Sequence, residues 1–191
     1  MPRKPTTSDT ARRILDIAER LLQTRGFNGF SYADIAAALS VTKASLHYHF
    51  PTKAKLGSRL IARYEKDFLG ALGEIDRTSD DAHQKLARYA RIYADALRNN
   101  RLCLCGMLAA EYATLPKPMQ REMRHFFDEN ERWLVTVLDE GCRSDTLKFS
   151  GSSVDVARML VGALEGAMML ARSYGEVSRF EAAADRLLAE L

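Results

Sequence analysis

Hydrophobic residues recur every three or four positions along almost the whole chain, which is the spacing of one face of a helix. The first such stripe ends at Gly26, a residue type that favours the C-terminal cap of a helix. Two short amphipathic segments separated by a tight turn follow, and the later segments are longer. Alternating patterns typical of strands are nearly absent. The sequence therefore predicts an all-α fold of about nine helices.

Polar residues that favour helix starts mark several boundaries. Residues 31–34 and 152–155 have the form of capping boxes, in which a serine is followed three positions later by an acid, and Thr42 can cap a short helix. Residues 178–181 have the same form and predict the start of the last helix. Another helix is expected over residues 102–114, ahead of two closely spaced prolines.

The composition is that of an ordinary folded protein. Of the 191 residues, 47% are hydrophobic and 28% are charged, which supports a core without disulfide bonds. The most apolar run, residues 159–171, is interrupted by Glu165 and falls short of the roughly 20 residues that span a membrane. No secretory signal is visible, so the three cysteines are expected to be reduced thiols. We expect a cytoplasmic protein with no membrane partner.

Positive charge is concentrated at the N-terminal end of the chain. The first 56 residues hold nine lysines and arginines but four acids, whereas acids outnumber basic residues in the remainder. A basic end favours a polyanionic partner. Arg3 and Lys4 can act as a basic arm on DNA or simply as a solubilising tail.

Two adjacent segments carry the clearest functional signal. FNGFSYADIA at residues 27–36, followed by VTKASLHYHFPTK at 41–53, resembles the DNA-binding segment of the TetR/AcrR family of bacterial transcriptional regulators. The resemblance implies a three-helix helix-turn-helix domain over residues 1–52 and a helical effector-binding and dimerisation domain over 53–191. It also implies a homodimeric repressor that leaves a palindromic double-stranded DNA operator when a small apolar effector binds, without a cofactor or metal. Activation of transcription is the less favoured alternative.

A helix-turn-helix places its second helix in the major groove, with polar side chains outward and apolar ones inward. Leu46 and Phe50 supply apolar residues that hold this helix to the domain. Tyr32 lies either near a phosphate, as the resemblance implies, or in the core. The helix that begins at Thr52 points its N-terminal amides outward, which suits a phosphate. The predicted DNA contacts are Tyr32, Thr42, Lys43, Ala44, Ser45, His47, Tyr48, His49 and Lys53.

Methionines and aromatic residues gather on the middle helices. They pack an ordinary core or line an adaptable apolar pocket, and both interpretations remain open. By resemblance they line an effector pocket composed of Tyr89, Tyr93, Met107, Tyr112, Met123, Phe126, Phe127 and Trp133.

The penultimate helix carries small residues at positions that permit close approach of another helix. Gly162 and Gly166, with Met169 nearby, are explained either by tight packing within the chain or by a dimer interface. The resemblance implies that residues 153–190 form the homodimer interface.

Cys103 and Cys105 are candidates for a redox or electrophile sensor. They lie near a predicted helix start and follow Arg98 and Arg101, an arrangement that favours a reactive thiolate. The alternative is that both are small buried hydrophobes. Their spacing does not match a zinc site.

Two competing functional classes have weaker support. A thiol hydrolase using Cys105 with His125 lacks any supporting motif, so no catalytic residues and no enzyme activity are predicted. A DNA-binding protein without sequence specificity would explain the basic N-terminal end alone.

Overall fold

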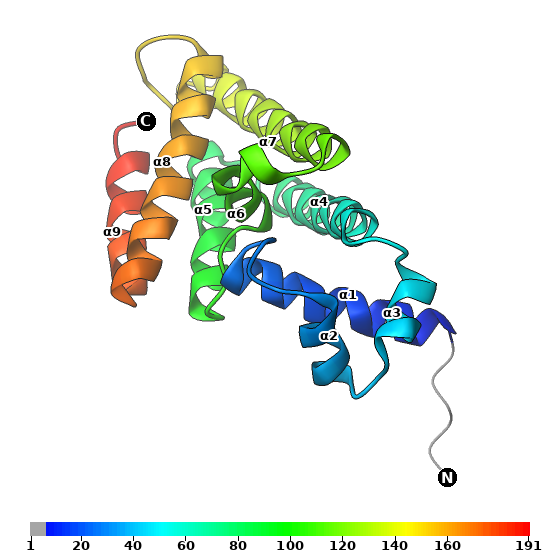
Figure 1. The fold of residues 1–191 in the computed structure, drawn as a ribbon. Coiled ribbons are helices and arrows are strands. Elements are labelled where there is room, and N and C mark those ends of the chain that lie inside the picture. The colour runs from blue at the N-terminus through cyan, green and yellow to red at the C-terminus, as the bar shows by residue number, and fades with distance from the viewer. Residues whose placement is uncertain (1–6) are drawn as a thin grey trace. The chain divides into compact units, whose positions relative to one another are not determined.

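The computed structural model describes residues 7–191, and the described part of the chain is helical and contains no strand (Figure 1). Within these described residues, nine α-helices and one short 3-10 helix follow one another as α1 (Thr7–Arg25), α2 (Tyr32–Leu39), α3 (Lys43–His49), α4 (Lys53–Thr78), α5 (Ala82–Arg98), α6 (Leu104–Ala110), η1 (Tyr112–Thr114), α7 (Lys117–Arg143), α8 (Ser153–Tyr174) and α9 (Val177–Leu188). This confirms the all-α prediction. Arg3 and Lys4, the predicted basic arm, lie outside the described residues.

Local capping explains why several helices begin and end where they do. Gly26 follows α1 with a φ of 82°, a left-handed conformation that favours glycine. Ser31 accepts a hydrogen bond from the Ala33 amide, while its own amide donates to Asp34, so the predicted capping box is present. Ser152 caps α8 as predicted by accepting a hydrogen bond from the Asp155 amide.

Two helix boundaries differ from the predictions. The last helix begins at Val177 rather than at Ser178, because α8 ends at Gly175 in a left-handed conformation and the chain turns directly into α9. The helix expected over residues 102–114 is divided into α6 and η1. The residue before Pro116 is extended, as the proline ring requires, so helix η1 cannot continue.

The chain forms two compact units. The N-terminal unit consists of the described residues up to Tyr64 together with Leu104–Met123, and the C-terminal unit of Glu65–Cys103 together with Arg124–Leu191. Helices α4 and α7 each contribute to both units. The expected functional boundary between residues 52 and 53 remains a prediction, since compactness and function need not divide a chain at the same place.

The N-terminal unit is built on an apolar core that the first four helices share. Its fully buried side chains include Ile14 and Leu22 of α1, Ile35 of α2, Leu46 of α3 and Leu60 of α4. Helix α6 packs beside α1 in the same unit. Burial of Leu46 and Phe50 holds the short helix α3 to the rest, as predicted.

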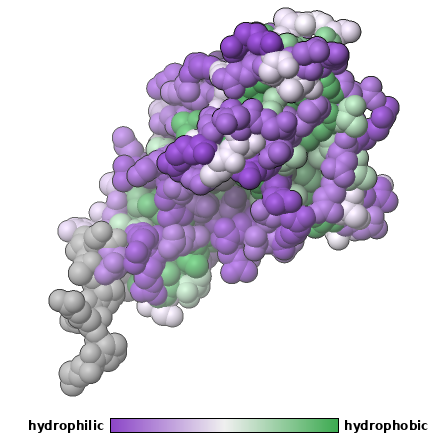
Figure 2. Space-filling model, turned by 180° about the vertical axis from the view of Figure 1, so that it is seen from behind, coloured by the Kyte–Doolittle hydropathy of each residue, from purple (hydrophilic) through white to green (hydrophobic). Residues whose placement is uncertain are grey.

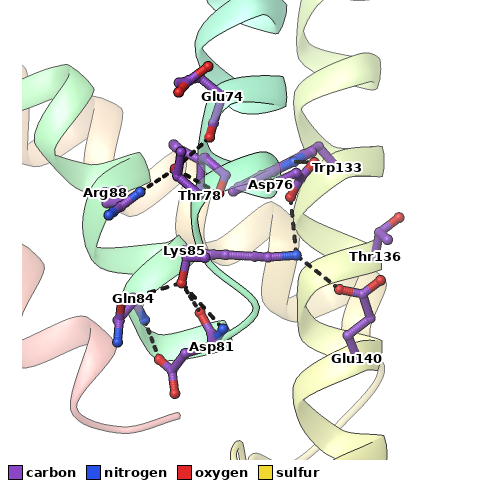
Figure 3. A network of polar contacts seen from close by, with 12 residues as sticks. Glu74, Asp76, Thr78, Asp81, Gln84, Lys85, Arg88, Trp133, Thr136 and Glu140 are labelled. Carbon is purple, nitrogen blue, oxygen red and sulfur yellow. Dashed lines mark hydrogen bonds and ion pairs between the residues drawn. The ribbon is translucent and has the colours of Figure 1, made fainter.

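In the C-terminal unit, α8 and α9 lie side by side and α5 contacts both (Figure 1). The end of α4, the start of α5 and the C-terminal half of α7 are tied by a polar network around a buried lysine (Figure 3). The Lys85 ammonium lies 3.2 Å from a carboxylate oxygen of both Asp76 and Glu140, and the Trp133 indole donates a hydrogen bond of 2.9 Å to Asp76. Because the lysine is paired on both sides, its burial is compensated.

Figure 2 shows hydrophilic residues over most of the face opposite to that of Figure 1, with smaller patches where hydrophobic residues reach the surface. In the described part of the chain, no helix has both the length and the apolar character that crossing a membrane requires.

Candidate nucleic-acid interface

The turn between α2 and α3 is defined by two capping residues. Ser40 ends α2 in a left-handed conformation with a φ of 54°, and its amide bonds back to the carbonyl groups of Ala36 and Ala37. Two residues later Thr42 begins α3 by accepting a hydrogen bond of 3.2 Å from the Ser45 amide. The caps leave a very short connection, which is what a helix-turn-helix requires.

Helix α3 presents a polar face to solvent. Leu46 is fully buried, whereas the Tyr48 side chain, two positions later, is 77% exposed. Of the predicted contacts, the exposed ones are Thr42, Lys43, Ala44, His47 and Tyr48, and the half-buried ones are Ser45 and His49. Six of these residues therefore lie on one accessible helix and Thr42 caps it. A hollow of about 350 Å³ beside the helix is lined partly by Lys43 and His47.

The structure favours the core position for Tyr32 over the phosphate contact implied by the resemblance. Its side chain is buried, and its hydroxyl donates a hydrogen bond of 2.7 Å to the carbonyl of Phe50. Burial raises the pKa of this hydroxyl to about 12. The ring also lies 4.8 Å from that of His47. Tyr32 thus supports the end of α3 from inside the domain.

Lys53 also turns inward, onto the loop between α1 and α2. Its ammonium donates hydrogen bonds to the carbonyl groups of Phe27, at 2.5 Å, and Phe30. It also lies 4.6 and 4.4 Å from the centres of these two rings, in the geometry of cation–π contacts. Burial lowers the pKa of Lys53, whereas the charges of Glu111 and Asp34 raise it. The lysine at the start of α4 therefore fastens the loop between α1 and α2.

Glu111, which the sequence analysis missed, fixes the same loop from the other side. Its carboxylate accepts hydrogen bonds from the amides of Phe27, at 2.6 Å, and Asn28, at 3.2 Å. A Cβ atom added at Gly26 would lie only 2.6 Å from Glu111 Oε1, so the absence of a side chain there makes room for the carboxylate. Only Gly26 gave a sequence signal, and it indicated a helix end rather than an acid far along the chain.

The residues predicted to form an effector pocket are divided between the two units. In the C-terminal unit, Tyr89, Tyr93 and Phe126 are buried, and both tyrosines pack edge-to-face with Phe68. Phe127 and Trp133 of this unit are half-buried. In the N-terminal unit, Met123 is buried, Met107 is half-buried and Tyr112 is 40% exposed. Tyr112 lies at the surface, in the 3-10 helix rather than in an apolar interior.

The surroundings of Cys103 and Cys105 differ from those that favour a reactive thiolate. Cys103 and Cys105 are 1% and 0% exposed, because both face the cores of their units. The Cys103 thiol donates a hydrogen bond to Glu165, so a thiolate would place two negative charges together. Arg98 is already paired with Asp95 and Glu181. Burial favours the small-hydrophobe alternative.

The surroundings of His125 do not support its role as the base of a thiol hydrolase. The His125 side chain is 62% exposed, while Cys105 is buried. The histidine ring lies 3.6 Å from carboxylate oxygens of Glu65 and Glu129. A hydrogen bond with the histidine's own backbone raises the pKa of His125, and the charge of Glu65 raises it further.

The glycines of α8 do not pack against another part of the described chain. A Cβ atom added at Gly162 or Gly166 would meet no atom within 4 Å. On the same helix, large hydrophobic side chains are exposed, including Met159, Met169 and Leu170. Tight packing within the chain therefore does not explain these glycines, and an apolar face of α8 is left uncovered.

Comparison with known proteins places this geometry in a family. The model of bacterial regulatory proteins of the tetR family matches residues 14–60, which contain the helix-turn-helix. A TetR transcriptional regulator from Legionella pneumophila is 31% identical, with 98% of this chain and 97% of that chain covered and a TM-score of 0.85. A TetR-family regulator from Agrobacterium tumefaciens has a TM-score of 0.94 at 29% identity, with 97% and 99% covered.

A curated relative agrees with these structural matches. The transcriptional repressor DhaR from Mycobacterium sp. (strain GP1) is 22% identical over 161 residues, which is 83% of this chain and 80% of the relative. Sequence, helix order and three-dimensional structure all lead to the same group of proteins. The chain belongs to the TetR family and is a DNA-binding transcriptional regulator.

Proposed function

We propose that the protein is a homodimeric repressor that inserts α3 into the major groove of a palindromic operator. The observation that carries this proposal is the exposed face of α3, where Lys43 and Tyr48 point outward while Leu46 is buried. Lys43, Thr42 and Ser45 bond base edges or phosphates, and Tyr48 contacts a phosphate or a thymine methyl group. The repressor named among the relatives supports the direction of regulation.

Dimerisation in this proposal uses the uncovered face of α8 and the neighbouring part of α9. The two glycines leave space for the close approach of a second helix, and Met159 and Met169 supply apolar surface that a partner would bury. A shallow groove of about 400 Å³ between α8 and α9 continues this surface and is lined mainly by small and apolar residues. A twofold dimer would present two copies of α3 to the two halves of a palindrome.

Regulation in this proposal comes from a small effector bound among the aromatic residues of the C-terminal unit. The effector lowers operator affinity only to the extent that it binds the DNA-incompetent conformation more tightly. The cytoplasmic location expected from the sequence belongs to the same proposal, because the operator must be accessible to the protein.

The test is the affinity of the purified protein for DNA taken from upstream of its own gene, compared with a scrambled duplex of equal length. Fluorescence anisotropy should show specific binding about a thousand-fold tighter than binding to the scrambled duplex, with two protomers for each palindrome. Equal affinity for both duplexes across the accessible upstream region would overturn the proposal and favour binding without sequence specificity. A promoter–reporter assay distinguishes repression from activation by the sign of the change on deletion.

A further inference from the structure

A polar cluster lies inside the otherwise aromatic core of the C-terminal unit. The hydroxyl oxygens of Tyr89 and Tyr93 on α5 are 3.0 Å apart, and the Asn130 side chain of α7 donates a hydrogen bond of 3.3 Å to Tyr93. Glu165 of α8 faces this group, since its charge acts on both tyrosines, and it receives a hydrogen bond from Cys103. Three helices and the segment before α6 thus bring polar groups to one place.

Two oxygen atoms of this cluster are buried without a hydrogen-bond donor. They are Oε1 of Glu165 and Oδ1 of Asn130, and the Asn130 side chain is 0% exposed. Nearly all buried acceptors in folded proteins are paired, because burying an unpaired one loses its bonds to water. When Glu165 is ionised both unpaired atoms are acceptors, so a group that would satisfy them must donate hydrogen.

The carboxyl group of Glu165 is also held in an unfavourable electrostatic environment. Burial raises its pKa to about 7, while the hydrogen bond from the Cys103 thiol acts in the opposite direction. Burial and the charge of Glu165 also raise the pKa values of Tyr89 and Tyr93, so both hydroxyls keep their protons near neutral pH. A positive charge brought to Glu165 would remove the penalty of ionising it.

The surroundings of the cluster are flat and aromatic. Trp133 stacks on Tyr89 with ring centres 5.7 Å apart, and Phe180 stacks on Tyr93 at 6.3 Å. Phe68 packs edge-to-face against both tyrosines. Aromatic faces attract cations and accommodate flat ligands, and Met168 beside Cys103 is a side chain that repacks easily.

We propose that Glu165, Asn130 and the Tyr89–Tyr93 hydroxyl pair form the polar end of the effector site, and that the effector is a lipophilic aromatic amine carrying a positive charge. This inference rests on the proposed function, because it names the chemical class of ligand for the same regulatory unit. The ammonium donates hydrogen bonds to the two unpaired oxygens, and the aromatic body of the ligand separates and replaces ring–ring contacts.

Matched ligands that differ only in their polar group test the proposal. Phenylbutylamine, phenylbutanol and phenylbutanoate form one series, and naphthylmethylamine, naphthylmethanol and naphthoate form a second. Isothermal titration calorimetry on the full-length protein at about pH 8 should show each amine binding about ten-fold or more tightly than its alcohol, with the carboxylate weakest. Preference for the alcohol or carboxylate, or no preference in either series, overturns the proposal.

Two variants test whether a preference for amines over alcohols arises at this cluster. Glu165→Gln keeps the shape of the side chain and should reduce the amine-to-alcohol ratio to about one, whereas the same change at the exposed Glu176 should leave the ratio as in the wild type. An amine preference that persists in Glu165→Gln shows binding elsewhere and overturns the proposal. If Glu165→Gln does not fold, the wild type decides: the ratio should rise about ten-fold between about pH 6 and pH 8 as Glu165 ionises, and a constant ratio overturns the proposal.

Operator binding, measured by anisotropy on the same samples, keeps the two proposals separate. Failure to bind operator contradicts the proposed function, whether or not the amines bind preferentially. Normal operator binding without an amine preference contradicts only the assignment of the ligand class.

Discussion

Two regions of the molecule treat a partly buried charge in opposite ways. At the loop between α1 and α2, Lys53 meets two carbonyl groups and two aromatic rings, and Glu111 meets two backbone amides. In the core beneath α8, Glu165 keeps one oxygen without a donor. In the first region the chain itself supplies partners for both charged groups, whereas in the second it leaves a carboxylate oxygen without one.

The difference indicates which polar residues hold the fold and which are available for binding. A charge whose bonding capacity is used internally rigidifies the structure and has little left for a ligand. A charge that remains unpaired costs stability, and such sites are more common where a protein binds or reacts. On this criterion Lys53 and Tyr32 belong to the framework of the DNA-binding region, while α3 and α8 carry the surfaces and groups that need a partner.

Removing the Lys53 ammonium should have the largest effect on stability. We expect Lys53→Met to lower the free energy of unfolding by about 2–4 kcal/mol, because two carbonyl groups lose a charged donor. Urea denaturation measures this loss, and Lys55→Met at the neighbouring exposed lysine should change it by less than about 0.5 kcal/mol. If Lys53→Met instead left stability unchanged and lowered the salt slope of DNA binding by about 1, Lys53 would be the phosphate contact first predicted.

Replacing Glu165, the charge that lacks a partner, should instead stabilise the protein at high pH. Its folded pKa of about 7 lies above the ordinary value of 4.5, so its favourable contribution is present below about pH 4.5 and is lost as pH rises through 7. Relative to wild type, Glu165→Gln should therefore gain roughly 3 kcal/mol between about pH 5 and pH 8. Urea midpoints at fixed protein concentration measure the change. A parallel pH dependence in both proteins would show that Glu165 ionises freely.

The exposed face of α8 should likewise require a partner, here a second protomer that covers it. Gly166→Leu meets open space within the protomer, so the fold should persist, but dimerisation should weaken by about 1–3 kcal/mol through overpacking at the interface. Sedimentation velocity measures the shift toward monomer. Gly73→Leu is the matched control, since this helical glycine of α4 also has no atom within 4 Å of an added Cβ. Equal behaviour of the two variants would exclude this face of α8 from the interface.

The smallest effect is expected on α3. Tyr48→Ala should leave stability nearly unchanged because the side chain is exposed, yet it should alter the ranking of operator variants by about 1 kcal/mol at one position. Anisotropy with single-base operator variants measures this ranking, and Lys43→Ala should affect a different position. A uniform loss for all variants would assign Tyr48 to the phosphate backbone instead.

Local signals predicted the framework of the DNA-binding region well. The glycine after α1, the serine box of α2 and the threonine cap of α3 each act within a few residues, so the sequence contains the information directly. The exception at Ser178 has a local cause too, because α8 ends at the left-handed Gly175 and Glu176 already occupies the N-cap position of α9.

Contacts between distant residues explain what the sequence analysis missed. Nothing near Lys53 in the sequence indicates that its ammonium meets the Phe27 and Phe30 carbonyl groups. The environment of Cys103 depends in the same way on Glu165, which belongs to a different helix. The residue types indicated that Lys53 and Cys103 are candidates for a functional role. Tertiary packing, however, determines which groups each side chain contacts.

The hydrogen bonds of Glu111 also bear on how this protein can be recombined with its relatives. A chimera joined near residue 52 would supply the loop at Gly26 from one parent and Glu111 from the other. A parent without an acid at the second position would leave the Phe27 and Asn28 amides unbonded, and one with a side chain at the first would collide with the carboxylate. A transplantable DNA-reading module therefore has to include Leu104–Met123 as a second, discontinuous insert.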